Sequence, residues 1–472
     1  MIGASLAVLL SGSLAQPVNA ESLRAALASA YRYNPDLEAE RANLRATDES
    51  VPQAQSGYRP RITAGADIGA AKTRTNLDGG PTATTGRNPA GYDVTINQNL
   101  FDGFQTTNRV NTAEANVRAG RAALHSTEQT VLLDAVTAYM DVVRDQAVVL
   151  LRENNVKVLT SNLRATRDRF NAGEVTRTDV AQSQARLADA VSDLDLARGN
   201  LKAARARYEQ IIGNPPSRLT AAAVPSDLLP KSLAEATNRA INEAPPVVSA
   251  LYLEQAARHN VDVIFGELLP QLSVSGQYRK GFSEVEGIYS RDTTEVLGLL
   301  TVPLYQGGEV RSRVRQAKHL HVRQIQLVAQ ERTLARERAI TAWAALNSFR
   351  ARLRSDKASV EANQIALNGV REEEKVGQRT LLDVLNAEQE LLNSQVSLVS
   401  SERNLVVSAY SLIAATGRLT AKELGLSKTI YDAEEHYFDV RRKWFGISIT
   451  HQDGRQERVD VWDSHGQRRT YK

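Results

Sequence analysis

The chain has 472 residues, of which 42% are hydrophobic, 24% are charged and only 5% are aromatic. Its formal net charge of +4 is small for this length, and no Lys/Arg run is interleaved with aromatic residues, so the composition argues against a nucleic-acid-binding protein. The absence of cysteine excludes thiol catalysis, cysteine-ligated zinc and disulfide bonds.

Residues 1–20 have most of the features of a secretory signal peptide. Residues 2–14 form a short apolar run rich in small residues, and Val18-Asn19-Ala20 gives a small-x-small cleavage site ahead of Glu21. A basic n-region is missing, so we expect the native start to lie further upstream. The alternative is an ordinary apolar N-terminus. We predict a signal peptide at 1–20 and therefore an exported protein.

Residues 21–217 are expected to form a first structural repeat that begins with short helices. Ser22-Leu23 opens a helix that runs to Asn34-Pro35. From Pro60 onwards, apolar residues alternate with polar or small ones over segments of about ten residues, as in transmembrane β-strands. We predict a β-hairpin over 60–101 with its tip at 71–90, based on the alternating residues Ile62, Ala64, Ala66, Ile68, Ala70, Val94, Ile96 and Leu100.

Residues 103–213 are predicted to form a long helical hairpin. No proline, the residue that breaks helix interiors, occurs between Pro89 and Pro215. Gly173 is suited to ending one helix, and Thr176 three residues before Asp179 is a capping-box-like start for the next. The ascending arm, 103–170, would span roughly 100 Å at about 1.5 Å per residue. A coiled-coil seam at heptad spacing supports the descending arm: Val180, Leu187, Leu194, Leu201 and Tyr208.

A linker at 218–230 separates this unit from a second copy at 231–420. Leu100-Phe101-Asp102-Gly103 recurs as Leu304-Tyr305-Gln306-Gly307, and Gly377 and Asp383 occupy the places of Gly173 and Asp179. The length difference between the copies is confined to a loop rich in Gly, Thr, Asn and Pro between residues 70 and 91. Such self-similarity indicates duplicated structure. We predict a second β-hairpin over 270–305, with its tip at 281–292, and a second helical hairpin over 307–417.

Four strands per chain cannot close a barrel, and open sheet edges are not tolerated in lipid. We therefore expect a mainly α protein with a transmembrane β part, in which three chains combine into a twelve-stranded barrel that continues into a coiled-coil tunnel. A small soluble sheet is the alternative. The charged tail, 421–472, has few apolar residues and is expected to be peripheral or partly disordered.

The paired strand-hairpins and helical hairpins resemble the TolC family of outer-membrane efflux proteins. The motifs that carry the resemblance are Leu-Phe-Asp-Gly at 100–103, Leu-Tyr-Gln-Gly-Gly at 304–308 and the two helical turns. The resemblance covers roughly residues 21–420. It implies a homotrimer in the outer membrane, in contact with lipid there, whose helical part lies in the periplasm. It also implies docking by a periplasmic adaptor protein and an inner-membrane pump.

The resemblance also implies a periplasmic gate and a pore ring. Carried over by position, Thr178 and Asp179 would meet Arg379, and Asp383 would face the pore. Two positions depart from the family pattern. Glu374 replaces a tyrosine and could itself reach Arg379, and Asn386 replaces a second pore aspartate, which leaves three charges per trimer rather than six. The expected adaptor-docking turns are Gly173, Val175, Thr176, Gly377 and Thr380.

Simpler roles stay open at these positions. Asp179 and Asp383 could be only helix-capping carboxylates, and Arg379 a solvated surface charge. We find no nucleophile–base–acid set and no metal-ligand or cofactor pattern, so we predict that the protein is not an enzyme and needs no cofactor. The favoured function is an exit channel for efflux or type I secretion, the cargo being drugs and other small toxic molecules or a secreted protein. A structural or adaptor coiled-coil protein of the envelope is the alternative.

Overall fold

In the computed structural model the described residues are 21–76, 78–427, 430–450 and 456–457, so the predicted leader lies outside them. The helices are α1 (Leu23–Tyr33), α2 (Pro35–Asp48), α3 (Ser50–Gln55), η1 (Ser56–Tyr58), α4 (Gln105–Asn171), α5 (Arg177–Ile212), η2 (Ser226–Leu228), α6 (Leu233–Glu243), α7 (Pro245–Gly266), α8 (Glu309–Lys375), α9 (Leu381–Ala415) and α10 (Glu435–Arg441). The strands are β1 (Arg61–Ile68), β2 (Ala71–Thr75), β3 (Ala83–Arg87), β4 (Ala90–Phe101), β5 (Gln271–Val285), β6 (Ile288–Thr301), β7 (Ile449–Thr450) and β8 (Gln456–Glu457).

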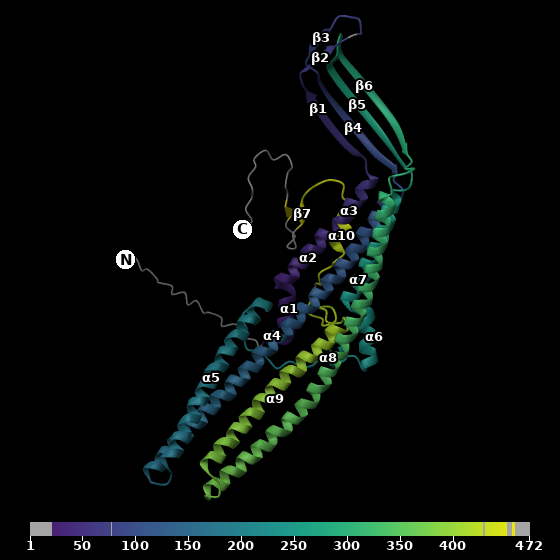
Figure 1. The fold of residues 1–472 in the computed structure, drawn as a ribbon. Coiled ribbons are helices and arrows are strands. Elements are labelled where there is room, and N and C mark those ends of the chain that lie inside the picture. The colour runs from purple at the N-terminus through teal and green to yellow at the C-terminus, as the bar shows by residue number, and fades with distance from the viewer. Residues whose placement is uncertain (1–20, 77, 428–429, 451–455, 458–472) are drawn as a thin grey trace, which may run out of the picture. The chain divides into compact units, whose positions relative to one another are not determined.

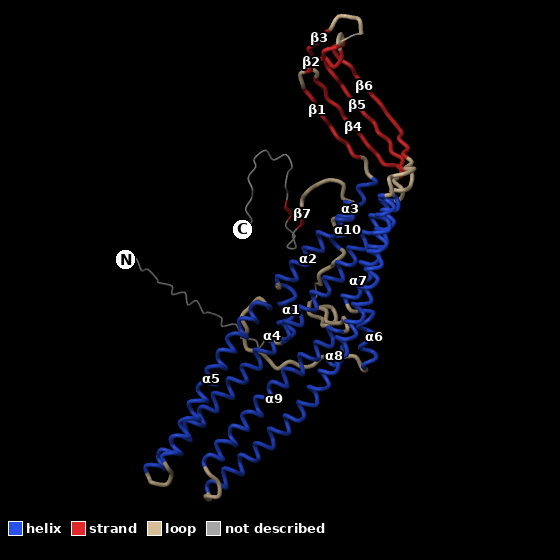
Figure 2. The backbone as a smooth tube through the Cα atoms, viewed as in Figure 1, coloured by secondary structure: helices blue, strands red, loops and turns tan. Residues whose placement is uncertain are grey.

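The predicted two-fold repeat is confirmed. In each half, short helices lead into strands (β1–β4 in the first half, β5 and β6 in the second), a helix of 67 residues and a returning helix of 36 or 35 residues (Figure 1). None of these four helices contains proline, which is what allows their length. The fold is mainly helical, as expected, and its largest β part is a four-stranded sheet, with two further two-stranded sheets, β2–β3 and β7–β8 (Figure 2). Within the described residues, no helix combines the length and apolarity that a membrane span requires.

The chain divides into two compact units. Unit 1 comprises Met1–Glu40, Ala123–Val247 and Glu331–Ile430, and unit 2 comprises Arg41–Ala122, Val248–Gln330 and Tyr431–Lys472. In unit 1 the predicted seam of α5 is buried from Leu194 onwards and half-buried at Val180 and Leu187. Tyr208 at its end is completely buried beside Tyr139. The hydroxyl oxygen of Tyr139 lies 2.7 Å from the carbonyl oxygen of Thr220 and 2.9 Å from that of Glu21. These contacts attach the start of α1 and the linker after α5 to the long helix α4.

The strands in unit 2 form one antiparallel sheet in the order β1-β4-β5-β6, with β1 and β6 at its edges. Residues opposite one another include Ile62, Ile96, Gly276 and Val296 in one row, and neighbouring rows on the same face add Val94, Val274 and Leu300. Rows that point to the other face carry Thr63, Asn97, Ser275 and Gln277. One face of the sheet is therefore largely apolar and the other largely polar.

The strand boundaries differ from the sequence expectation at both ends. Residues 71–90, expected to be a loop, contain the separate β2–β3 pair, and the second tip is shorter because β5 runs to Val285. The threonines in β2 and β3 favour extended backbone. An expectation based on alternating apolar residues overlooks such strands, because threonine is polar. At the other end, β6 stops at Thr301 because Pro303 has no backbone N–H to donate.

Gly103 and Gly307 are repeat partners that allow a sharp comparison. Both have positive φ, 67° and 63°. An added Cβ at Gly103 would lie 2.3 Å from the carbonyl oxygen of Gly266, whereas at Gly307 nothing lies within 4 Å. Each Gly→Ala change should incur left-handed strain of about 1–2 kcal/mol. Gly103→Ala should lower the free energy of unfolding by about 1–3 kcal/mol more than Gly307→Ala, because its new methyl group overpacks against Gly266.

Urea unfolding of the two purified variants, followed by circular dichroism, tests this difference. Gly103→Ala should unfold at a clearly lower urea concentration than Gly307→Ala. Equal midpoints would show that the close approach of Gly103 to Gly266 does not constrain this junction.

Candidate functional site

The first helical turn joins α4 to α5 through Gly173, whose φ is +81°. The N–H of Gly173 donates to the carbonyl of Phe170 (3.0 Å), and that of Glu174 to the carbonyl of Arg169 (2.9 Å), which closes the helix end. Thr176 then caps α5. Its N–H donates to Asp179 Oδ2 (2.8 Å), and the Asp179 N–H donates to Thr176 Oγ1 (3.3 Å). The turn is thus a closed helix end followed by a complete capping box.

The second turn repeats this geometry between α8 and α9. Gly377 has φ +77°, the N–H of Thr380 donates to Asp383 Oδ2 (3.0 Å), and the Asp383 N–H donates to Thr380 Oγ1 (3.3 Å). Both aspartates therefore act as capping carboxylates in the single chain, which was the simpler of the two roles considered for them.

The capping boxes make the turns sensitive to acid. The pKa values of Asp179 and Asp383 lie below their ordinary 3.8, chiefly because each carboxylate accepts the backbone N–H of its capping threonine. A carboxyl whose pKa is lowered by folding contributes stability that is present above its unfolded pKa. That contribution is lost as pH falls through the lower, folded value.

We expect the first turn of α5 to open as pH falls below about 4, the unfolded carboxyl range. Thr176→Ala should weaken this turn at neutral pH by about 0.5–2 kcal/mol because the cap is lost. Amide hydrogen exchange over the first turn of α5, corrected for intrinsic pH dependence, measures both effects. Thr178→Ala in the same turn is the matched control, and equal protection loss in both variants would contradict the capping role.

A polar groove lies beside these turns, between α4 of the first hairpin and α8–α9 of the second. Its volume is about 640 Å³. Arg169 Nη1 donates to Glu374 Oε1 across the groove (2.8 Å), and Arg186 Nη2 on α5 donates to Asn386 Oδ1 on α9 (2.8 Å). These contacts join residues about two hundred positions apart in sequence, so they connect one repeat to the other.

Glu388 is the best-shielded charged group in this groove. Its side chain is only 7% exposed. The carboxylate accepts from Arg371 Nη2 (2.7 Å) on α8 and from Asn162 Nδ2 (3.1 Å) on α4. A carboxylate removed from water stays charged at low cost only when such donors satisfy it. Glu388 therefore binds three helices together.

The structure gives the predicted gate residues other partners than expected. Arg379 Nε donates to Glu373 Oε2 (2.9 Å) instead of Asp179, and Glu374 pairs with Arg169 instead of Arg379. Asn386, expected to face the pore, accepts from Arg186 within the chain. The expected contact of Thr178 and Asp179 with Arg379 stays a prediction. Val175, like the turn glycines, lies between the helix ends.

Sequence reasoning missed Arg169, Asn162 and Glu388. One signal existed, since Glu388 lies four residues after Val384 and three before Leu391, which places a charge on the apolar face of α9. Within the described residues, no group of three His, Cys, Asp or Glu side chains is arranged to hold a metal ion.

The family model "Outer membrane efflux protein" matches residues 26–214 and 236–418, one match for each repeat. The chain therefore belongs to the outer membrane efflux protein family, a family of channel proteins, and is an outer-membrane protein. These matches fall on the paired strand and helix hairpins.

Individual proteins agree with this assignment. The outer membrane efflux protein BepC of Brucella suis is 40% identical over 458 residues, which cover 95% of this chain and 97% of BepC. Outer membrane protein TolC of Escherichia coli is 25% identical over 396 residues, which cover 79% of this chain and 78% of TolC. The crystal structure of the Campylobacter jejuni CmeC outer membrane channel superposes with a TM-score of 0.77 at 17% identity and covers 89% of both chains, which supports the fold.

Proposed function

We propose that three copies of this chain form a passive exit channel. Their sheets combine edge to edge into a twelve-stranded barrel in the outer membrane, and their helical hairpins form the tunnel below it. The observation that carries the proposal is the sheet itself, which has one apolar face, one polar face and two unpaired edges. The apolar face suits lipid and the polar face suits a water-filled lumen. Edge pairing between copies satisfies the open backbone groups.

The helical turns and the groove beside them form the gate in this proposal. Contacts between Arg169 and Glu374, and from Glu388 to Arg371 and Asn162, hold the two hairpins of one chain together. Arg379 and Asp179, whose partners Glu373 and Thr176 lie in their own turns, would contact neighbouring chains in the trimer. A periplasmic adaptor, delivering cargo from an inner-membrane pump, docks at the turns and competes with these contacts. Exposed ion pairs contribute only about 0–1 kcal/mol each, which a docking partner can overcome.

The channel conducts and does not catalyse, and its cargo is chosen upstream. Efflux of small molecules is favoured over protein secretion because BepC, an outer membrane efflux protein, aligns over nearly the whole chain. A structural coiled-coil role would explain the helices but would leave the two-faced sheet without a purpose.

Single-channel recording of the purified protein in a planar bilayer tests the proposal. We expect discrete conductance steps from a detergent-extracted trimer. A water-soluble monomer that gives no steps would overturn both the barrel and the channel.

A further inference from the structure

The tail beyond the second repeat includes a helix that the sequence did not predict. α10 packs on α3 and α4 in unit 2, and its residues Tyr437 and Val440 are 9% and 5% exposed. Tyr437 contacts the cluster formed by Val51, Ala113 and Val117. The tail therefore joins the core of this unit instead of being held only by charges.

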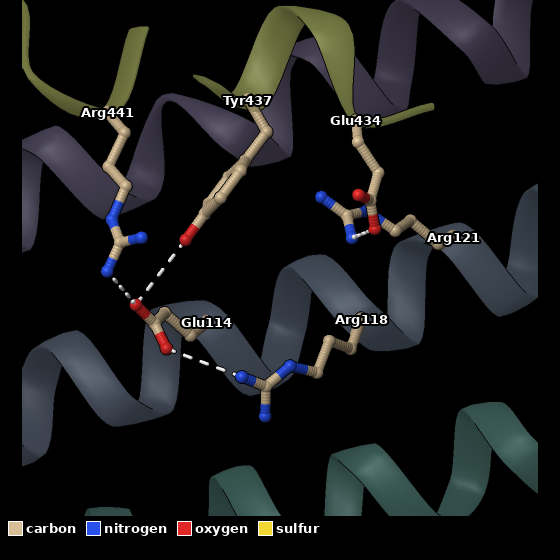
Figure 3. A network of polar contacts seen from close by, with 6 residues as sticks. All are labelled: Glu114, Arg118, Arg121, Glu434, Tyr437 and Arg441. Atoms are coloured by element: carbon tan, nitrogen blue, oxygen red, sulfur yellow. Dashed lines mark hydrogen bonds and ion pairs between the residues drawn. The ribbon is translucent and has the colours of Figure 1, made fainter. Parts of the chain in front are cut away.

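Charged side chains fix the direction of α10 on α4 (Figure 3). Glu114 on α4 accepts from Arg441 Nη2 (3.1 Å) and from the Tyr437 hydroxyl (3.4 Å), and Arg121 Nη1 donates to Glu434 (2.6 Å). Three tail side chains thus reach α4 at two points along its length. This double attachment sets where the chain goes after α10 ends.

The segment after α10 lies beside the chain that enters β1. Arg59 Nη1 donates to the carbonyl of Lys443 (2.9 Å), and its guanidinium carbon lies 4.6 Å from the centre of the Trp444 ring. Arg59 precedes the first residue of β1, Arg61, by two positions. A cation–π contact of this kind holds the indole at the helix-side end of the sheet.

Four large apolar side chains of this segment are exposed. Trp444 is 60% exposed, Phe445 87%, Ile447 54% and Ile449 53%. Arg442 and Lys443, both exposed, precede them directly. So dense an exposed apolar group beside cationic residues marks a contact with something outside the chain.

We propose that residues 442–449 are a membrane contact that lies in the periplasmic-side lipid interface of the outer membrane. The proposal rests on the proposed function, in which the apolar face of the sheet is in lipid. That face is bounded at its far end by the ring pair Tyr92–Tyr278 and at its helix-side end by Phe101, the end at which Trp444 is held.

Two physical arguments select phospholipid as the occupant. Tryptophan prefers the level of the lipid headgroups, where its ring is apolar and its N–H can find a polar partner. Arg442 and Lys443 supply positive charge for headgroup phosphates, as basic residues next to a membrane surface do. The segment thus adds an aromatic anchor on the β1 side of the sheet, supplied from the far end of the sequence.

Quenching of Trp444 fluorescence by bromolipid tests the proposal on the full chain. Trp343→Phe with Trp462→Phe leaves Trp444 as the sole tryptophan. When this variant is reconstituted into vesicles of acyl-chain-brominated phosphatidylcholine with phosphatidylglycerol, Trp444 should lose most of the fluorescence that it emits in unbrominated vesicles. A second reporter, with Val296→Trp and all three native tryptophans changed to Phe, shows whether the sheet itself is in lipid. In a third variant, which keeps only Trp343 on α8, the tryptophan fluorescence should not be quenched by bromolipid.

The outcomes separate the two ideas. If Val296→Trp is quenched and Trp444 is not, the anchor is wrong while the channel stands. If neither is quenched, the membrane-inserted sheet fails as well. If Trp444 is shielded from both bromolipid and aqueous acrylamide, a protein surface covers it and the lipid assignment is overturned.

Discussion

Channels that carry Glu374→Ala together with Glu388→Ala should pass a several-fold larger resting current in planar bilayers than unaltered channels. Glu374 supplies the acceptor for Arg169, and Glu388 accepts from Arg371 and Asn162. Hydrogen bonds to a charged group contribute about 1.5–3 kcal/mol, so Glu388 should dominate the effect. Since each 1.4 kcal/mol changes an equilibrium about tenfold, loss of these contacts should shift the proposed gate strongly toward its open form.

Glu372→Ala is the matched control for this experiment. Glu372 lines the same groove and carries the same charge, but it pairs with Lys375 on its own helix (2.7 Å) and joins nothing across the groove. A current increase of the same size in Glu372→Ala would show that negative charge, and not a contact between hairpins, sets the resting state. The charge-reversed variant Arg169→Glu with Glu374→Arg keeps an ion pair across the groove. Its resting current should therefore be lower than that of Glu374→Ala.

The long helices and their turns could be predicted because their causes are local. Proline placement permits the helices, and a glycine followed by a Thr-x-x-Asp box ends one and starts the next. The sheet was predictable in number of strands and in its two faces, because alternation is also local. The β2–β3 pair was missed because threonine-rich segments read as loops when only apolar residues are counted.

The partners of the gate residues could not be predicted, since they depend on which faces of two distant helices meet. The family resemblance placed Arg379 against Thr178 and Asp179, a contact that stays a prediction, and left Glu374 able to reach it. Within the chain, Arg379 pairs with Glu373. Helix α10 was missed for a related reason. Its apolar side is a single turn, Tyr437 and Val440, which carries no periodic signal until α3 and α4 supply the opposite surface.

Adjacent residues in β6 should respond in opposite ways to the same substitution. Val296 lies in the row of Ile62, Ile96 and Gly276 on the apolar face, while Leu297 lies opposite Ser275 on the polar face. Val296→Lys should abolish assembly in the outer membrane, because a lysine facing the middle of the bilayer costs about 2–4 kcal/mol in every chain. Leu297→Lys should assemble normally, because in the proposed barrel its charge faces the water-filled lumen, and it should change only the ion selectivity.

The measurement is the amount of trimer recovered from outer-membrane fractions, followed by conductance of whatever assembles. The two changes match in charge, in strand position and in the small loss of β-propensity, so a difference between them reports the face alone. Because a barrel of three chains contains three copies of each lysine, the penalty for Val296→Lys is multiplied in the assembly, whereas a soluble sheet with both faces in water would tolerate both variants alike. Equal recovery of the two trimers would therefore contradict a sheet with one face in lipid.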